Sequence, residues 1–327
     1  MKRLLIAVLA AIAVTTISAS AGWMWLQSQI QMPGPLAENI ELIIEPGAGL
    51  NRIARELKEA SVIKSATVFR LHARFSGFAG QLKAGEYRFR AGVSAADALA
   101  KLVANDVVVR FVTISEGLTS TQIVDVIRAA NGLSGEISES FAQGTLLPET
   151  YGFSRGETRT NLIRRMSQQM DRTVTGLWLS RADGLPFDTA DEAIALASIV
   201  EKETAIAAER GRVAAVFVNR LKRGMRLQSD PTVAFGMDAS GPLGRRLRRT
   251  DLDRETPYNT YKIPGLPPGP ICHPGRDALA AVLNPTPTDD LYFVADGSGG
   301  HAFAKTLAEH NRNVARWRRV QRSRGDR

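Results

Sequence analysis

A run of uncharged, mostly apolar residues extends from Leu4 to Leu26 and restricts what the N-terminal part of this chain can become. Its length is close to the roughly 20 residues that a helix needs to cross a bilayer. The run ends in Trp23-Met-Trp-Leu26, and paired tryptophans suit a membrane interface, so we expect an uncleaved anchor over residues 4–26. The segment Ala19-Ser-Ala21 resembles a signal-peptidase site, and cleavage there is the competing interpretation.

Two basic residues, Lys2 and Arg3, precede the apolar run. They favour a cytoplasmic end at residues 1–3, with the remaining chain exported. We therefore expect a single-pass protein of the cell inner membrane, with its folded part on the periplasmic side. Exported chemistry has no ATP or nicotinamide cofactor, and the sequence contains no phosphate-cradling glycine loop, so no cofactor is expected.

The chain carries a formal net charge of +9, which indicates an anionic partner surface such as a membrane, an acidic polymer or nucleic acid. Much of this excess lies in residues 311–327, where seven arginines stand against one aspartate. No nucleic-acid motif accompanies this segment, so we expect a basic tail at 319–327 and no nucleic-acid partner. A single cysteine, Cys272, rules out an internal disulfide bond.

A pattern of short strand, glycine turn and amphipathic helix recurs three times after a Pro- and Gly-containing linker at residues 27–38. The turns follow Ile43, Tyr87 and Val112, and each precedes apolar residues at helical spacing. The pattern predicts a small α/β module, which we place at residues 39–110. Scaffolding and carbohydrate binding are both open as its role.

Residues 189–204 predict a buried helix that begins with a capping box, Thr189 followed by Glu192. Residues 193–200 are apolar or small on every side, after which Glu201 follows on the face of Ala197 and Ser198. Desolvation and the negative end of the helix dipole both favour a protonated carboxyl group there, which suits a general acid. Alternatively, Glu201 is the first solvated residue after a core helix, paired with a Lys or Arg. Glu203 points about 200° away from Glu201 and is not expected to share its surroundings.

A second amphipathic helix is expected at residues 207–223, with Gly224 as its cap. Turn-rich segments with aromatic and polar residues occupy 146–153, 225–232 and 257–271, and such segments often bind ligands. A strand is expected at 291–295, followed by a glycine-rich turn.

Seven motifs in order resemble the MltG (YceG-like) family of endolytic murein transglycosylases. They are Leu147-Pro-Glu-Thr-Tyr151, Ala197-Ser-Ile-Val-Glu-Lys-Glu-Thr204, Val218-Asn-Arg-Leu221, Leu227-Gln-Ser-Asp-Pro-Thr232, Tyr258-Asn-Thr-Tyr261, Gly265-Leu-Pro-Pro-Gly269 and Leu291-Tyr-Phe-Val-Ala-Asp296. The sequence departs from the family at Ser229, where Thr is common, and at Cys272-His273, where Ala-Asn is usual.

The resemblance implies an α+β protein with a transmembrane helix, a LysM-like α/β module and a mixed α+β catalytic domain, placed at 111–318. It also implies an enzyme that cuts the β-1,4 bond between N-acetylmuramic acid and N-acetylglucosamine in nascent glycan strands. The products carry 1,6-anhydro ends, and strand elongation stops. By the same resemblance, Glu201 is the expected catalytic residue. Expected partners are peptidoglycan glycan strands and penicillin-binding proteins or other cell-wall synthases.

One carboxyl group suffices for this chemistry, because the 6-hydroxyl of the sugar attacks the anomeric carbon and no water nucleophile is needed. Candidate substrate-binding residues are Glu149, Tyr151, Asn219, Gln228, Asp230, Tyr258, Asn259 and Tyr261. Asn219 and its neighbour Arg220 suit a structural role equally well, and Asp230 is equally a turn residue before Pro231.

Three rival interpretations are weaker. A non-catalytic, membrane-anchored glycan-binding scaffold for cell-wall synthases fits the same anchor and module. A metal hydrolase would need His273, His301 and His310, whose spacing matches no metal site, so no metal is expected. A nucleophile at Cys272 is disfavoured because the flanking Ile271 and Pro274 suit a rigid structural position.

Overall fold

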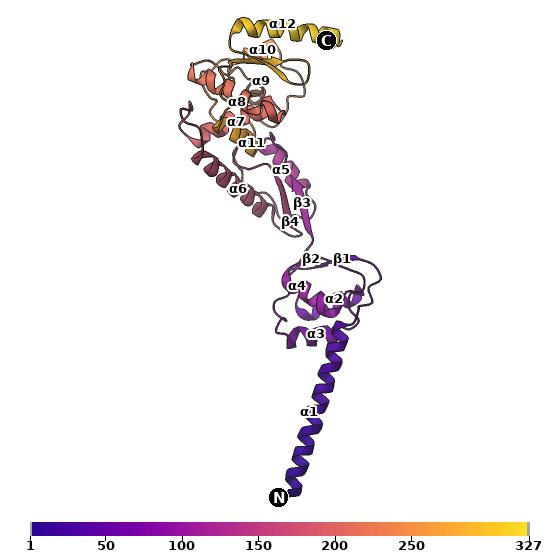
Figure 1. The fold of residues 1–327 in the computed structure, drawn as a ribbon. Coiled ribbons are helices and arrows are strands. Elements are labelled where there is room, and N and C mark those ends of the chain that lie inside the picture. Colours follow the sequence, from indigo (N-terminus) through magenta and orange to yellow (C-terminus); the bar gives the residue numbers. More distant parts are fainter. Residues whose placement is uncertain (1, 326–327) are drawn as a thin grey trace. The chain divides into compact units, whose positions relative to one another are not determined.

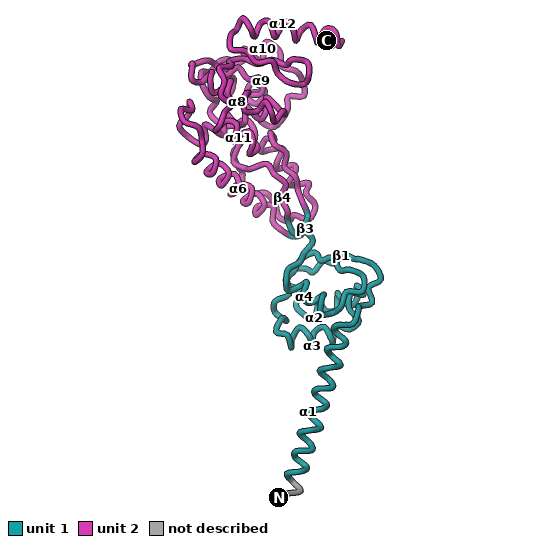
Figure 2. Tube along the Cα trace, in the orientation of Figure 1, with its two compact units in different colours: residues 1–110, 153–156 teal, residues 111–152, 157–327 magenta. Residues whose placement is uncertain are grey.

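The computed structural model describes residues 2–325 and divides into two compact units. Unit 1 comprises residues 1–110 and 153–156, and unit 2 comprises residues 111–152 and 157–327 (Figure 2). Met1 of the expected cytoplasmic end and residues 326–327 of the expected basic tail lie outside the described residues.

Unit 1 begins with a long helix and continues as a strand–helix–helix–strand–helix module. Its elements are α1 (Lys2–Gln31), β1 (Ile40–Ile44), α2 (Leu50–Glu59), α3 (Ala66–Phe75), β2 (Gly85–Phe89) and α4 (Ala95–Ala104) (Figure 1). The strands pair antiparallel with Leu42 opposite Tyr87. The first two expected strand–turn–helix units are confirmed as β1–α2 and β2–α4. The sequence pattern did not predict α3, although Ser65 caps it by accepting the N–H of Val68.

The core of unit 1 is built from one face of each helix against the strand pair. Ile53 and Leu57 of α2, Phe69 of α3, and Tyr87 and Phe89 of β2 are all buried. Burial of such side chains is worth about 1.5–3 kcal/mol each, before the entropy cost of ordering them. The module therefore has a hydrophobic core of its own.

Residues 27–38, expected as a linker, are packed rather than free. Helix α1 continues to Gln31, and Ile30 and Leu36 are buried in the core of unit 1. A Cβ atom on Gly34 would lie 2.4 Å from the carbonyl oxygen of Val93. The segment packs through its apolar side chains, although its Pro and Gly content favours turns.

Unit 2 is mainly helical, with short strand pairs at its margins. Its helices are α5 (Ser120–Ala129), α6 (Arg159–Leu179), α7 (Ala190–Glu203), α8 (Ala207–Lys222), α9 (Asp230–Met237), α10 (Arg249–Leu252), α11 (Arg276–Leu283) and α12 (Leu307–Ser323). Strands β5 (Tyr292–Ala295) and β6 (His301–Ala304) form an antiparallel hairpin. Strands β3 (Val109–Thr113) and β4 (Thr150–Ser154) form another sheet, and their residues are divided between unit 2 and unit 1. Mixed helix and strand content with one N-terminal apolar helix is as expected.

Helix α7 is the centre of unit 2. Both halves of its predicted capping box form: the N–H of Glu192 donates to Thr189 Oγ1, and Glu192 Oε2 accepts the N–H of Thr189. Leu196, Ile199 and Val200 are fully buried against α8 and α11. The predicted α8 is confirmed, and Gly224 follows it with a φ of 66°. Residues 319–323 of the expected basic tail form the last turn of α12.

Candidate active site

Two glutamates stand at the C-terminal end of α7 and face different surroundings. Glu201 lies one turn beyond Ala197 and Ser198, whereas Glu203 lies one turn beyond Ile199 and two beyond Leu196. The loop that carries Ser229 and Asp230 packs beside Glu203.

Glu203 is the carboxyl group with the properties of a general acid. Burial raises its pKa to about 7, and the neighbouring Asp230 acts in the same direction. The hydroxyl of Ser229 donates a 2.5 Å hydrogen bond to Glu203 Oε1 and opposes the rise, as do His301 and Arg220. A carboxyl group with this pKa holds its proton in a large fraction of molecules near neutral pH.

The loop before α9 is bound tightly to the segment 258–261. Ser229 N–H donates to Thr260 Oγ1 at 3.0 Å, and Gln228 N–H donates to the carbonyl oxygen of Thr260 at 3.2 Å. Gln228 adopts a φ of 51°, which a non-glycine residue rarely holds without surrounding constraint. This backbone conformation brings Ser229 and Asp230 to Glu203.

Tyr261 and Asp230 form a second polar pair beside Glu203. The Tyr261 hydroxyl donates a 2.7 Å hydrogen bond to Asp230 Oδ1. Burial and this contact raise the pKa of Tyr261, and the charge of Glu203 adds to the rise. Gln228, Asp230 and Tyr261 are therefore the predicted residues that the structure gathers near Glu203.

The other predicted substrate-binding side chains have partners within the protein. Asn259 is fully buried and donates to the carbonyl oxygens of Leu252 and Arg254. Asn219 donates to those of Thr288 and Asp290. Their amide N–H groups are thus used to hold loops in place.

The two remaining aromatic candidates also have partners within the protein. The Tyr151 hydroxyl donates to the Leu147 carbonyl oxygen at 2.7 Å, and its ring is buried. Tyr258 packs edge-on against Phe235, with ring centroids 4.8 Å apart. Glu149 is exposed, and its charge acts on Tyr151 and Glu116 rather than on Glu203.

Glu201, the residue expected to be catalytic, belongs to a different cluster. Its Oε2 accepts the backbone N–H of Gly275 at 2.9 Å. Burial raises the pKa of the nearby Glu116, and the charge of Glu201 adds to this effect. A Cβ atom on Gly275 would meet the Glu116 carboxyl group at 1.8 Å, so both glutamates lie against this glycine. Its partner is thus a backbone amide, not the Lys or Arg of the alternative interpretation.

The Cys272-His273 pair has a structural environment. The Cys272 thiol contacts the carbonyl oxygen of Ser198 at 3.3 Å, and burial raises its pKa, which disfavours a thiolate nucleophile. His273 is buried between Ser120 Oγ at 3.0 Å and the backbone of Leu146, and burial lowers its pKa to about 4. The side chain therefore joins the start of α5 to the Leu146 loop as a neutral imidazole.

A glutamate–histidine pair that the sequence did not reveal lies at the turn between β5 and β6. The Glu209 carboxyl group contacts His301 Nδ1 at 2.7 Å and accepts the His301 backbone N–H at 3.0 Å. Glu209 lies in the first turn of α8, where the helix dipole favours a negative charge. The charge of His301 acts on Glu203, so this hairpin belongs to the surroundings of the site.

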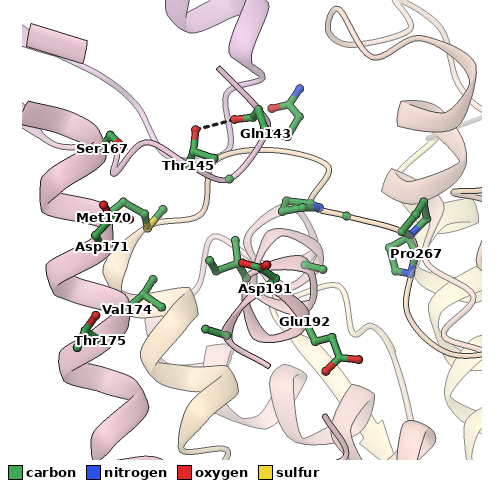
Figure 3. A pocket seen from close by; sticks show the side chains of 18 residues that line it. Gln143, Thr145, Ser167, Met170, Asp171, Val174, Thr175, Asp191, Glu192 and Pro267 are labelled. Carbon is green, nitrogen blue, oxygen red and sulfur yellow. Dashed lines mark hydrogen bonds between the residues drawn. The ribbon is translucent and has the colours of Figure 1, made fainter. Parts of the chain in front are cut away.

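A cavity of about 690 Å³ lies at the opposite end of α7 (Figure 3). It is lined by α6, the N-terminal part of α7, residues 142–145 and the proline-rich segment 267–270. None of the predicted site residues lines it. Glu203 and this cavity are separate features of unit 2.

The described residues define an α+β protein with one apolar N-terminal helix and a desolvated carboxyl group among polar loops. The sequence profile of the YceG-like family matches residues 42–316, and the chain belongs to this family. The resemblance drawn from the motifs is thereby confirmed.

Named relatives and a solved structure agree with this membership. The chain is 32% identical to the "Endolytic murein transglycosylase" of Bacillus subtilis, over 84% of this chain and 83% of that protein. It is 29% identical to the protein of the same name from Streptococcus pneumoniae strain D39, over 96% of this chain but only 65% of that longer protein. A YceG-like protein from Listeria monocytogenes has a similar crystal structure, with a TM-score of 0.53 and 28% identity, over 84% of this chain and 98% of that one.

Proposed function

We propose that this chain is an endolytic murein transglycosylase that cleaves the β-1,4 bond between N-acetylmuramic acid and N-acetylglucosamine in nascent glycan strands. Family membership and the names of the relatives support this class of enzyme over a non-catalytic scaffold. The observation that carries the chemistry is the desolvated carboxyl group of Glu203, with its pKa of about 7. Glu203 replaces Glu201 as our candidate for the catalytic residue.

The reaction needs one group that is first an acid and then a base. Protonated Glu203 gives its proton to the glycosidic oxygen as the bond to the anomeric carbon breaks. The resulting carboxylate takes the proton of the muramyl 6-hydroxyl as that oxygen bonds to the same carbon. The products are a free 4-hydroxyl group and a 1,6-anhydro end, and no water is consumed. A pKa close to the working pH suits both the donation of the proton and its later removal from the 6-hydroxyl.

The neighbours of Glu203 orient its carboxyl group and the substrate. Ser229 fixes one carboxyl oxygen, which leaves the other for the substrate. Gln228 and Asp230 are exposed beside it, and with Tyr261 they are the candidates for binding hydroxyl and acetamido groups. Asn219, Asn259 and Tyr151 support the loops.

Unit 1 supports the proposed location. Helix α1 is long and apolar enough to cross a membrane, with a mean hydropathy of 2.0 over its most apolar part. We place it in the cytoplasmic membrane, with the rest of unit 1 and unit 2 on the periplasmic side. The module that follows α1 suits a LysM-like role in holding glycan strands, and cell-wall synthases are the proposed protein partners.

The test is incubation of the detergent-purified chain with uncrosslinked glycan strands, followed by mass spectrometry. Products with 1,6-anhydro-muramyl ends support the enzyme. Intact strands that nevertheless co-sediment with the protein would support the scaffold instead.

A further inference from the structure

Helix α1 serves two different environments along its length. Its last turns belong to the core of unit 1, where Leu26 and Ile30 are buried. Its earlier large side chains are exposed, from Leu5 at 62% to Met24 at 70%. An uninterrupted helix joins the two parts, so the place where the span ends is fixed relative to the core of unit 1.

The geometry of the span places the membrane surface near Trp23 and Trp25. The residues from Leu5 to Trp25 extend over about 30 Å at a rise of 1.5 Å per residue, which matches the hydrocarbon thickness of a bilayer. Both tryptophans are at least half exposed, and tryptophan is enriched at the boundary between headgroups and acyl chains. Beyond this point the helix enters the protein core.

The C-terminal end of α3 lies at the same level. The ring of Phe75 contacts Trp23 edge-on, with centroids 6.1 Å apart. Figure 1 shows α3 within unit 1 beside the end of α1, while β1 and β2 lie on the opposite side of that unit. Any membrane that surrounds Trp23 therefore reaches Phe75.

The exposed face of α3 has the composition of an interfacial helix. Leu71 and Phe75 are spaced i, i+4 on one face, and Phe78 follows the helix end, with exposures of 36%, 66% and 37%. Arg70 and Arg74 form the adjacent i, i+4 row. Apolar rings beside arginines suit a bilayer surface with anionic headgroups.

We propose that Leu71, Phe75 and Phe78 dock unit 1 onto the bilayer surface, with Arg70 and Arg74 on anionic phospholipid headgroups. This membrane-docking face holds the module against the membrane, rather than leaving it suspended on the anchor. The inference rests on the membrane anchoring proposed above and is independent of the transglycosylase chemistry.

Depth-dependent fluorescence quenching tests the docking in the full chain. I12C, F75C and R88C are each labelled with a thiol-reactive fluorophore and reconstituted into vesicles of phosphatidylethanolamine and phosphatidylglycerol. Ile12 lies in the middle of the span, and Arg88 is an exposed residue of β2. Because Cys272 is buried, the parent chain should remain unlabelled.

Lipids that carry a quencher near the headgroup or deep in the acyl chain then report the depth of each probe. We expect deep quenching at position 12, loss of fluorescence with the shallow quencher at position 75, and no quenching at position 88. If the probe at position 12 is quenched but the probe at position 75 is quenched by neither lipid, the docking is overturned and the anchor stands. An unquenched probe at 12 would overturn the anchor and the docking together.

Discussion

Ser229 Oγ donates a 2.5 Å hydrogen bond to Oε1 of Glu203, and this contact joins the end of α7 to the loop before α9. Ser229 is 1% exposed, so water does not readily replace its hydroxyl group. The contact fixes the proposed proton donor while opposing the rise in its pKa that burial causes.

S229A should move the upper pH limit of activity to higher pH, because it removes a hydrogen bond that lowers the pKa of Glu203. Oε1 of Glu203 also loses the partner that fixes its orientation. We therefore expect kcat to fall about tenfold, equivalent to the loss of one hydrogen bond of about 1.4 kcal/mol. S229T, which keeps the hydroxyl group, is the matched control and should behave like the parent. An unchanged pH profile in S229A would contradict the role given to this contact.

The activity of the parent chain should decline above about pH 7. Glu203 must be protonated to release the glycosidic oxygen, and its pKa of about 7 sets that limit. We expect kcat/KM to fall about tenfold per pH unit on the alkaline side. Rates measured by release of anhydro-muramyl products across pH 5–9 test this, and a flat profile to pH 9 would exclude Glu203 as the acid.

The same group should make folding stability depend on pH. Its folded pKa, about 7, is above the unfolded value of 4.5, so its contribution is complete below about pH 4.5 and is lost as the pH rises to about 7. E203Q cannot ionise, and at pH 8 its free energy of unfolding should exceed that of the parent by about 3 kcal/mol, with no gain at pH 4.

E192Q provides a control of opposite sign for that measurement. The backbone N–H groups of Asp188 and Thr189 lower the pKa of Glu192. Its contribution is therefore present above the unfolded pKa and is lost as the pH falls through the folded value. E192Q should be less stable than the parent at pH 8, and denaturant titrations should show the two variants diverging in opposite directions.

G34A should destabilise unit 1, because the new Cβ atom would lie 2.4 Å and 2.5 Å from two backbone carbonyl oxygens. Neither carbonyl can move without shifting the module, and we expect a loss of about 2 kcal/mol. G80A, which meets no atom within 4 Å, should leave stability nearly unchanged. Equal unfolding midpoints for both variants would show that residues 27–38 are a loose linker after all.

Much of the fold could be predicted from the sequence, because capping residues and apolar spacing indicated the same helices. The capping box at Thr189, the apolar run after it and the spacing of the α8 stripe all predicted the helices that form. Helix α3 was missed because Leu71 and Phe75 are exposed, so its apolar residues do not follow a single buried face.

The site could be predicted only in part from the sequence. The choice between Glu201 and Glu203 depends on which face of α7 the loops cover. A signal for Glu203 was present: the residues four and seven positions before it are Ile199 and Leu196, both large and fully buried. Those before Glu201 are Ala197 and the partly exposed Ile194. The partners of Asn219 are 69 and 71 residues away in the chain, so its structural use was not visible in the sequence. Asn259 holds carbonyl groups of its own loop, seven and five residues before it, which its motif did not indicate.

The most direct test compares E203Q with E201Q on uncrosslinked glycan strands, with anhydro-muramyl products counted by mass spectrometry. Removing the proton donor should lower the rate at least about a hundredfold, the usual contribution of general acid catalysis. We predict this loss for E203Q, with E201Q retaining cleavage and both variants folded. Normal cleavage by E203Q together with an inactive E201Q would return the catalytic role to Glu201 and contradict this account.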